Sequence, residues 1–259
     1  MSKESLETKL IESAQQSWLK PALKILAIIG ITLGIFVAGQ LIPALIVVVV
    51  LGVMGNNTDQ ITDILSNNIA AQLVVTAGIA LTTVSILWYA LKLRGHNPKK
   101  FLLLDKLPSP GQLGEVVLTY GVYFMTLIAA SIAISILVPG VDVDQTQELG
   151  VADTAGNGLI AVFIMLAVIP PIFEEILFRG FLYRYISRFG GVIAGYILTS
   201  VLFGAAHLEF GNLNWIAAID TLVFSGFLIY ISQKHKSLYS AIFMHAIKNS
   251  IAFFVLFVL

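Results

Sequence analysis

The chain has 259 residues, of which 58% are hydrophobic and only 12% are charged. Soluble domains carry about a quarter charged residues, so the composition excludes an ordinary soluble protein and indicates a polytopic membrane protein. The sequence contains no cysteine, which excludes disulfides, thiolate zinc sites and a cysteine nucleophile.

The first 20 residues are more polar than the rest and precede the first long apolar run. Apolar side chains recur in them at helical spacing: Leu6, Leu10, Ile11 and Trp18. This spacing favours a helix on the membrane surface, although a loose polar tail fits equally well. We therefore interpret residues 1–20 as a cytoplasmic or interfacial segment, and residues 21–259 as one transmembrane bundle.

Seven apolar segments are long enough to cross a bilayer, since a spanning helix needs ~20 residues. They lie at residues 22–54, 69–91, 114–138, 158–186, 190–208, 213–232 and 237–258. The sequence therefore predicts an all-α polytopic fold of about seven transmembrane helices in one bundle. The first segment is overlong and contains Pro43, so it predicts either one tilted helix or a helix followed by a re-entrant piece.

Lysine and arginine are confined to one side of this arrangement. The loops at 55–68, 139–157 and 209–212 hold none, and carry acidic residues instead: Asp59, Asp63, Asp142, Asp144, Glu148 and Asp153. Because basic loops stay in the cytoplasm, this distribution predicts a cytoplasmic N-terminus. We expect a multi-pass protein of the cell membrane, with no nucleic-acid partner.

Small residues at four-residue intervals predict sites where helices pack closely. Such intervals occur at Gly30, Gly34 and Ala38, and again at Gly191 and Gly195. These positions are structural, and we expect no chemistry from them.

The fourth apolar segment contains three charged residues: Glu174, Glu175 and Arg179. One ionised group at mid-membrane costs ~2.5–3.5 kcal/mol, so each needs a reason to be there. Glu175 and Arg179 are four residues apart, which predicts a supporting ion pair on one helix face. Glu174 points ~100° away from that pair. It lacks a local partner, which favours a functional role.

Two further helices bring polar groups to similar depth. Counted from the turn near Phe189, Glu174 and His207 each lie on the order of 20–25 Å along the arms of a helical hairpin. The last segment adds His245 and Asn249, four residues apart on one face. Pro170 and Pro171 precede Glu174 and predict a kink that opens a polar gap beside it.

Asp220 and Lys248 also lie inside apolar segments. Each is about 12 residues from the turn that joins the sixth and seventh segments, so the two side chains should be level. We expect a structural ion pair between them.

These polar groups allow two kinds of chemistry. A carboxylate and an imidazole can activate a water, while a second histidine and an asparagine can stabilise an oxyanion. Alternatively, Glu174, His207 and His245 can hold a divalent metal such as zinc, with one position open for water. The sequence does not decide between them, and the His-Glu-x-x-His zinc helix is missing.

The three motifs together resemble a known family. Glu174-Glu175-x-x-x-Arg179, Phe203-x-x-x-His207 and His245-x-x-x-Asn249 follow in order as in the CPBP (Abi) family of type II CAAX prenyl proteases and bacteriocin-processing enzymes. The resemblance covers roughly residues 158–255, the motif-bearing core. It implies an intramembrane endopeptidase in which Glu174 and His207 activate water, His245 and Asn249 stabilise the oxyanion, and Glu175, Arg179 and Phe203 support them.

The resemblance also implies a substrate and a location. The substrate would be a membrane-associated or lipid-modified peptide or protein entering from the bilayer or the cytoplasm, and the short loops suit a prokaryotic plasma-membrane member. Two rival hypotheses remain: a non-catalytic immunity or scaffold protein of the same fold, and a proton- or metal-coupled transporter. The absence of a visible internal repeat weakens the transporter hypothesis.

Overall fold

The computed structural model describes residues 3–138, 156, 158–208 and 215–259, with side chains from Leu19 onward. Within these ranges the chain is helical and has no strand, so the predicted all-α fold is confirmed. The elements are α1 Lys3–Val53, α2 Thr58–Asn67, α3 Ile69–Leu93, α4 Pro98–Phe101, α5 Pro110–Leu137, α6 Gly158–Phe163, the π-helical turn η1 Ile164–Val168, α7 Ile169–Glu175, the π-helical η2 Ile176–Tyr183, α8 Arg184–Ala205, α9 Trp215–His235 and α10 Leu238–Phe257.

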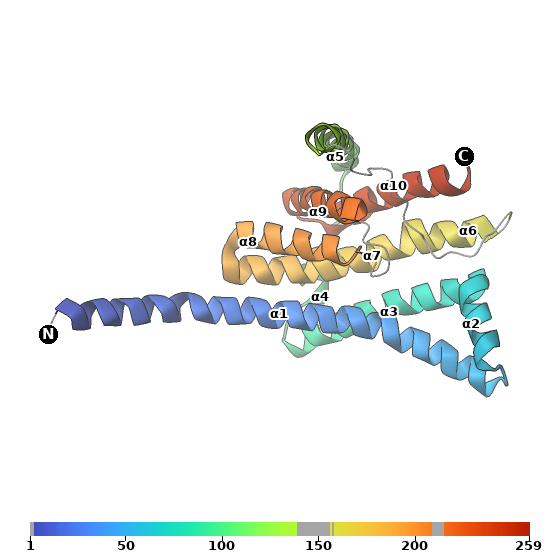
Figure 1. The fold of residues 1–259 in the computed structure, drawn as a ribbon, viewed down its shortest axis with the longest axis horizontal. Helices are drawn as coiled ribbons and strands as arrows, with labels where there is room; N and C mark the ends of the chain where they lie inside the picture. The colour runs from blue at the N-terminus through green and yellow to red at the C-terminus, as the bar shows by residue number, and fades with distance from the viewer. Residues whose placement is uncertain (1–2, 139–155, 157, 209–214) are drawn as a thin grey trace.

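Six described helices are long and apolar enough to cross a membrane, which indicates a multi-pass membrane protein. The longest candidate, Gly158–Ala205, folds back on itself (Figure 1). The reversal is at Gly191, whose φ of 84° lies in the left-handed region that glycine adopts without strain. Its two arms correspond to the fourth and fifth apolar segments, with the turn next to the predicted position.

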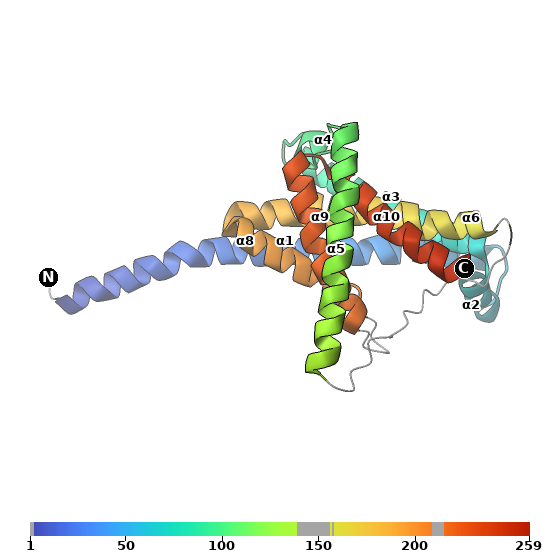
Figure 2. The same ribbon diagram turned by 90° about the horizontal axis from the view of Figure 1, so that it is seen from above.

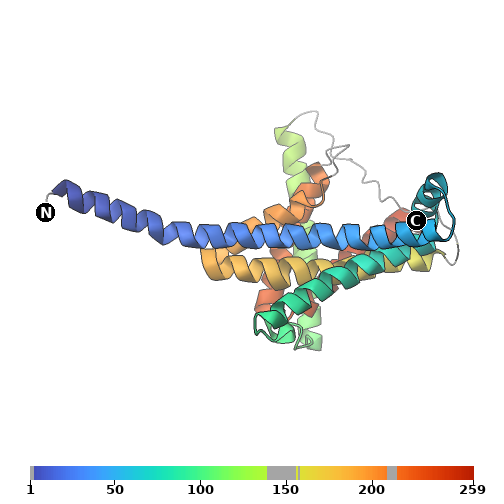
Figure 3. The same ribbon diagram turned by 90° about the horizontal axis from the view of Figure 1, so that it is seen from below.

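Helix α1 is continuous from Lys3 to Val53, so the alternative of a re-entrant piece after Pro43 is wrong. Its backbone passes the predicted boundary at residue 20 without a break, and its N-terminal part extends beyond the bundle (Figures 1 and 3). Neither the interfacial location of this part nor the membrane orientation is tested by the fold. The side chains of Leu6, Leu10, Ile11 and Trp18, and the acidic residues of 139–155, lie outside the described residues.

Close packing of α1 occurs at other glycines than those predicted. A β-carbon added at Gly30 or Gly34 would meet nothing within 4 Å, so that prediction is wrong. The tight positions are Gly39, where the β-carbon would lie 2.2 Å from Thr83 Oγ1, and Gly78, where it would lie 2.7 Å from Pro43 Cβ. Both join α1 to α3. In the hairpin, the prediction holds for Gly195, where an added β-carbon would lie 3.0 Å from the Tyr183 ring, and is wrong for Gly191, where it would meet nothing within 4 Å.

Two apolar cores flank the polar residues. The larger joins η2 and α8 to α1 and α3, around Leu177, Leu182 and Ile186. The smaller joins α5, α9 and α10, around Phe224, Leu228 and Met244. Helix α5 runs across the line of α1 and lies over α9 and α10 (Figure 2). The segment α7–η2 and helices α9 and α10 therefore meet between these cores, where the motif residues lie.

Candidate active site

The prolines before the first motif leave a backbone acceptor open. The carbonyl of Leu166 would normally accept from the N–H four or five residues later, at positions 170 and 171, but both are proline and have no N–H. Asn249 Nδ2 on α10 donates to this carbonyl at 2.8 Å. The Leu166 carbonyl, which the two prolines leave without a helical donor, thus orients the amide of Asn249. That amide keeps a second N–H for another acceptor.

Glu175 and Arg179 form the predicted ion pair. Arg179 donates from Nη1 to Glu175 Oε1 at 2.8 Å, and both side chains are fully buried. The guanidinium also lies over the ring of Phe203, 4.0 Å from its centroid, an arrangement that stabilises a cation. Phe203 is itself fully buried on α8. The pair therefore joins the two arms of the hairpin behind the site.

His245 is oriented by the same carboxylate. Its Nδ1 lies 2.9 Å from Glu175 Oε1, and a carboxylate paired with arginine is an acceptor, so Nδ1 carries the hydrogen. The rings of Phe203 and Phe224 meet the imidazole edge to face, at 6.0 and 5.6 Å between centroids. This packing and the hydrogen bond hold Nε2 on the opposite edge of the ring.

Glu174 lies on the other side of that imidazole. Its Oε2 is 3.9 Å from His245 Nε2, too far for a hydrogen bond. This buried oxygen has no hydrogen-bond partner among the described residues. The predicted lack of a local partner is therefore confirmed for Oε2, whereas the adjacent Glu175 forms hydrogen bonds with both Arg179 and His245.

His207 follows the end of α8 and bonds to its own helix. Its Nδ1 lies 2.8 Å from the carbonyl oxygen of Phe203. Because a carbonyl can only accept, Nδ1 carries the hydrogen, and the neutral ring has its lone pair at Nε2. The ring packs on Phe203 at 4.7 Å between centroids. In the described part of the chain no hydrogen bond or ion pair joins His207 directly to Glu174.

A single cavity of about 530 Å³ brings these groups together. Its lining includes Glu174, Phe203, His207, His245 and Asn249, whereas Glu175 and Arg179 lie behind it. Side chains from α7, the end of α8, α9 and α10 thus face one volume, as the depth argument predicted. Their catalytic roles remain predictions.

The wall of the cavity contains the predicted pair of Lys248 and Asp220. Lys248 Nζ donates to Asp220 Oδ2 at 2.6 Å, and about a fifth of each side chain is exposed. The hydroxyl of Tyr123 on α5 donates to the other oxygen of Asp220. Tyr123 could not be predicted from the sequence, because α5 has no polar pattern and the contact spans 97 residues.

The three candidate metal ligands do not form a metal-binding cluster. Among the described residues, no three histidine, aspartate or glutamate side chains lie close enough to hold one ion. Glu174 Oε2 and His245 Nε2 lie 3.9 Å apart. His207 instead forms a hydrogen bond with the backbone carbonyl of Phe203. The side chains as placed do not fit a three-ligand zinc site, so we derive no step through a metal.

The part of the chain that carries this site matches a known family. Residues 156–251 match the family model of the type II CAAX prenyl endopeptidases, Rce1-like. This segment is thus similar to the Rce1-like family. The match includes all three motifs of the CPBP resemblance and supports a CAAX-type intramembrane endopeptidase in general terms. Searches of curated proteins and of solved structures gave no match.

One polar network lies outside both the Rce1-like motifs and our sequence predictions. His235, at the end of α9, is buried and bonds through Nδ1 to Ser240 Oγ and through Nε2 to Glu115 Oε2, each at 2.9 Å. In the sequence His235 lies between Lys234 and Lys236, so no pattern distinguishes it from a basic loop residue. Lys234 completes the network with an ion pair to Glu115 at 2.8 Å.

Proposed function

We propose that the chain is an intramembrane endopeptidase that hydrolyses a peptide bond of a membrane-associated or lipid-modified substrate. The observation that carries the proposal is the shared cavity, where Glu174 lies among two histidines and an asparagine and its Oε2 has no hydrogen-bond partner among the described residues. A buried carboxylate without a partner is costly in a membrane protein, and a catalytic base is a reason to keep one.

In the proposed reaction, Glu174 takes a proton from a water whose oxygen attacks the scissile carbonyl carbon. His207 Nε2 accepts the second hydrogen of that water and orients it. As the tetrahedral intermediate collapses, the C–N bond breaks and Glu174 returns its proton to the leaving amine. Glu174 is thus first base and then acid, and the protein regains its starting state.

The oxyanion is assigned to His245 and Asn249. Asn249 offers the N–H that is not donated to Leu166. His245 already uses Nδ1–H toward Glu175, so it can donate from Nε2 only as an imidazolium. Glu175, on the opposite edge of the ring, supplies the negative charge that this form needs while Glu174 holds the proton taken from water. Fixed donors of this kind typically contribute 10²–10³-fold to the rate.

The test is cleavage of a prenylated peptide, with a quenched fluorophore on its C-terminal tail, by the purified protein in liposomes. Glu174→Gln and His207→Ala should each lower kcat by about 10²–10⁴-fold. Asp59→Asn, which removes an exposed carboxylate on α2, should retain full activity. Activity within a few fold of wild type in both site variants would refute the proposed water activation.

The same experiment separates the alternative, a non-catalytic immunity or scaffold protein of this fold. That alternative predicts no cleavage by the wild type and an unchanged cellular phenotype in both variants. Metal analysis of the purified protein, combined with chelator treatment, tests whether a divalent metal such as zinc takes part. We further propose a prokaryotic plasma membrane as the location, with substrate entering from the bilayer or the cytoplasmic side.

A further inference from the structure

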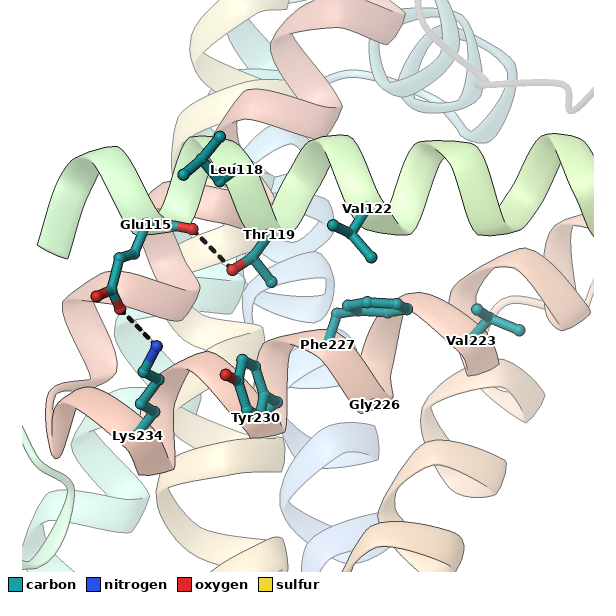
Figure 4. A pocket seen from close by; sticks show the side chains of 9 residues that line it. All are labelled: Glu115, Leu118, Thr119, Val122, Val223, Gly226, Phe227, Tyr230 and Lys234. Carbon is teal, nitrogen blue, oxygen red and sulfur yellow. Dashed lines mark hydrogen bonds and ion pairs between the residues drawn. The ribbon is translucent and has the colours of Figure 1, made fainter.

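A second hollow lies between α5 and α9, and it shares no lining residue with the candidate active site (Figure 4). Its volume is about 620 Å³. Most of its lining is apolar: Leu118 and Val122 come from α5, and Val223 and Phe227 come from α9. Figure 4 shows Val122 on the side of α5 that is nearer to Phe227. Both helices are candidate membrane spans, so a groove between them opens toward hydrocarbon rather than toward water.

Gly226 makes room in this groove. It lines the hollow on α9, and a β-carbon added there would meet nothing within 4 Å. The glycine therefore does not serve a close helix contact. It widens the groove midway along its apolar part, where a hydrocarbon chain can lie against the backbone.

One end of the groove is charged. Lys234 Nζ and Glu115 Oε2 are 2.8 Å apart, and nearly half of each side chain is exposed, 46% and 45%. The second contact of the Glu115 carboxylate, from His235 Nε2, also reaches Oε2. This leaves Oε1 without a recorded contact in the described part of the chain, and Figure 4 shows it turned away from Lys234.

The charged end and the apolar end are separated along α9. Lys234 lies eleven residues after Val223, which corresponds to roughly 16 Å of helix. Lys234 is also on the cytoplasmic side predicted from the basic residues. The groove thus resembles one leaflet of a bilayer: one end carries a positive and a negative charge, and most of the remaining lining is apolar.

We propose that this groove binds one phospholipid with a zwitterionic ethanolamine head group. An acyl chain lies over Gly226, the phosphate binds Lys234, and the primary ammonium donates to Glu115. Two adjacent protein charges of opposite sign complement the two charges of this head group. A choline head group cannot donate the hydrogen bond to Glu115, and a purely anionic head group offers no cation to it.

The chain position is tested by filling the groove. Full-length protein is reconstituted with phosphatidylethanolamine, extracted gently and examined by native mass spectrometry for a retained lipid. Gly226→Leu should lower retention about tenfold, because the leucine occupies the track. Gly34→Leu is the matched control, since it also adds a side chain to open space on a spanning helix, and it should retain the lipid. Equal retention in the two variants would overturn the proposal.

The head-group contacts are tested by a change that leaves the groove open. The double variant Lys234→Met, Glu115→Gln keeps a hydrogen-bond acceptor for His235 and should lower retention of phosphatidylethanolamine about tenfold. Wild-type protein in vesicles of phosphatidylethanolamine should retain several times more lipid than in phosphatidylcholine or phosphatidylglycerol. Equal retention of all three lipids would mean nonspecific annular lipid and would overturn the proposed site. Neither experiment depends on proteolysis, so their outcome is separate from that of the proposed function.

Discussion

The segment α7–η2 carries two adjacent carboxylates, Glu174 and Glu175, in different environments on its two faces. On the core face, Glu175 is fully buried and contacts both Arg179 and His245. On the cavity face, Glu174 is partly exposed, and its Oε2 has no hydrogen bond among the described residues. Residue type and depth are the same, so the difference comes only from what each face packs against.

This difference shows how one helix holds a structural and a reactive charge side by side. A buried charge is tolerated when a partner and hydrogen bonds replace its hydration. Glu175 meets that condition and also fixes the ring of His245. Glu174 does not, and it remains available to exchange a proton with a substrate water. The structural face therefore positions the imidazole that the cavity face uses.

The comparison predicts opposite effects on stability when each carboxylate is neutralised. Glu175→Gln leaves the buried Arg179 unpaired and should lower the free energy of unfolding by about 3–4 kcal/mol. Glu174→Gln removes an unpartnered charge and should raise it by about 1 kcal/mol. Thermal unfolding of both variants in the same detergent measures the difference. A larger loss of stability for Glu174→Gln than for Glu175→Gln would reverse our assignment of the two faces.

Arg179 supplies the control for this prediction. Arg179→Met alone should destabilise the fold about as much as Glu175→Gln, because it leaves the partner charge buried. Combining both changes should recover at least half of the loss, since neither charge is then left buried without its partner. The double variant should still be inactive, because a glutamine at position 175 carries no negative charge to stabilise the imidazolium of His245.

A smaller effect is expected at the cavity wall, where the ion pair is partly exposed. Among the described residues, Lys248→Met leaves Asp220 with only Tyr123 as a side-chain hydrogen-bond donor, and it should lower the free energy of unfolding by about 2 kcal/mol. Adding Asp220→Asn should restore most of it. A harmless single substitution, measured by the same thermal unfolding, would show that this pair contributes nothing to stability.

Much of this arrangement was predictable because helices impose fixed spacing. The ion pair of Glu175 and Arg179 follows from four-residue spacing, and that of Asp220 and Lys248 follows from equal distances to one turn. The hairpin reversal was predicted near Phe189 and Gly190, within two residues of the observed turn at Gly191. Periodicity and helix length suffice for such features, because the two partners lie either on one helix or on two antiparallel helices joined by a short turn.

Features that depend on contacts between distant helices were not predictable. The spacing of Gly30 and Gly34 indicated close packing, but the α1–α3 contact uses Gly39 and Gly78, because helix rotation decides which glycines face a neighbour. Likewise, equal depth suggested that Glu174 and His207 face each other. Depth along a helix fixes height but not rotation, and the nearest recorded side-chain contact of Glu174 is His245.

The smallest predicted effect concerns the hydrogen bond by which the Leu166 carbonyl orients the side-chain amide of Asn249. Changing both Pro170 and Pro171 to alanine restores N–H groups that can bond to the Leu166 carbonyl, and these would compete with the Asn249 amide. Loss of one orienting hydrogen bond, worth about 1 kcal/mol, should lower kcat about fivefold. Because alanine favours helix, stability should not fall.

Pro108→Ala, in the connection before α5, is the control and should leave kcat unchanged. An unchanged kcat in the double variant would mean that the amide of Asn249 is held by its own helix, without help from the Leu166 carbonyl.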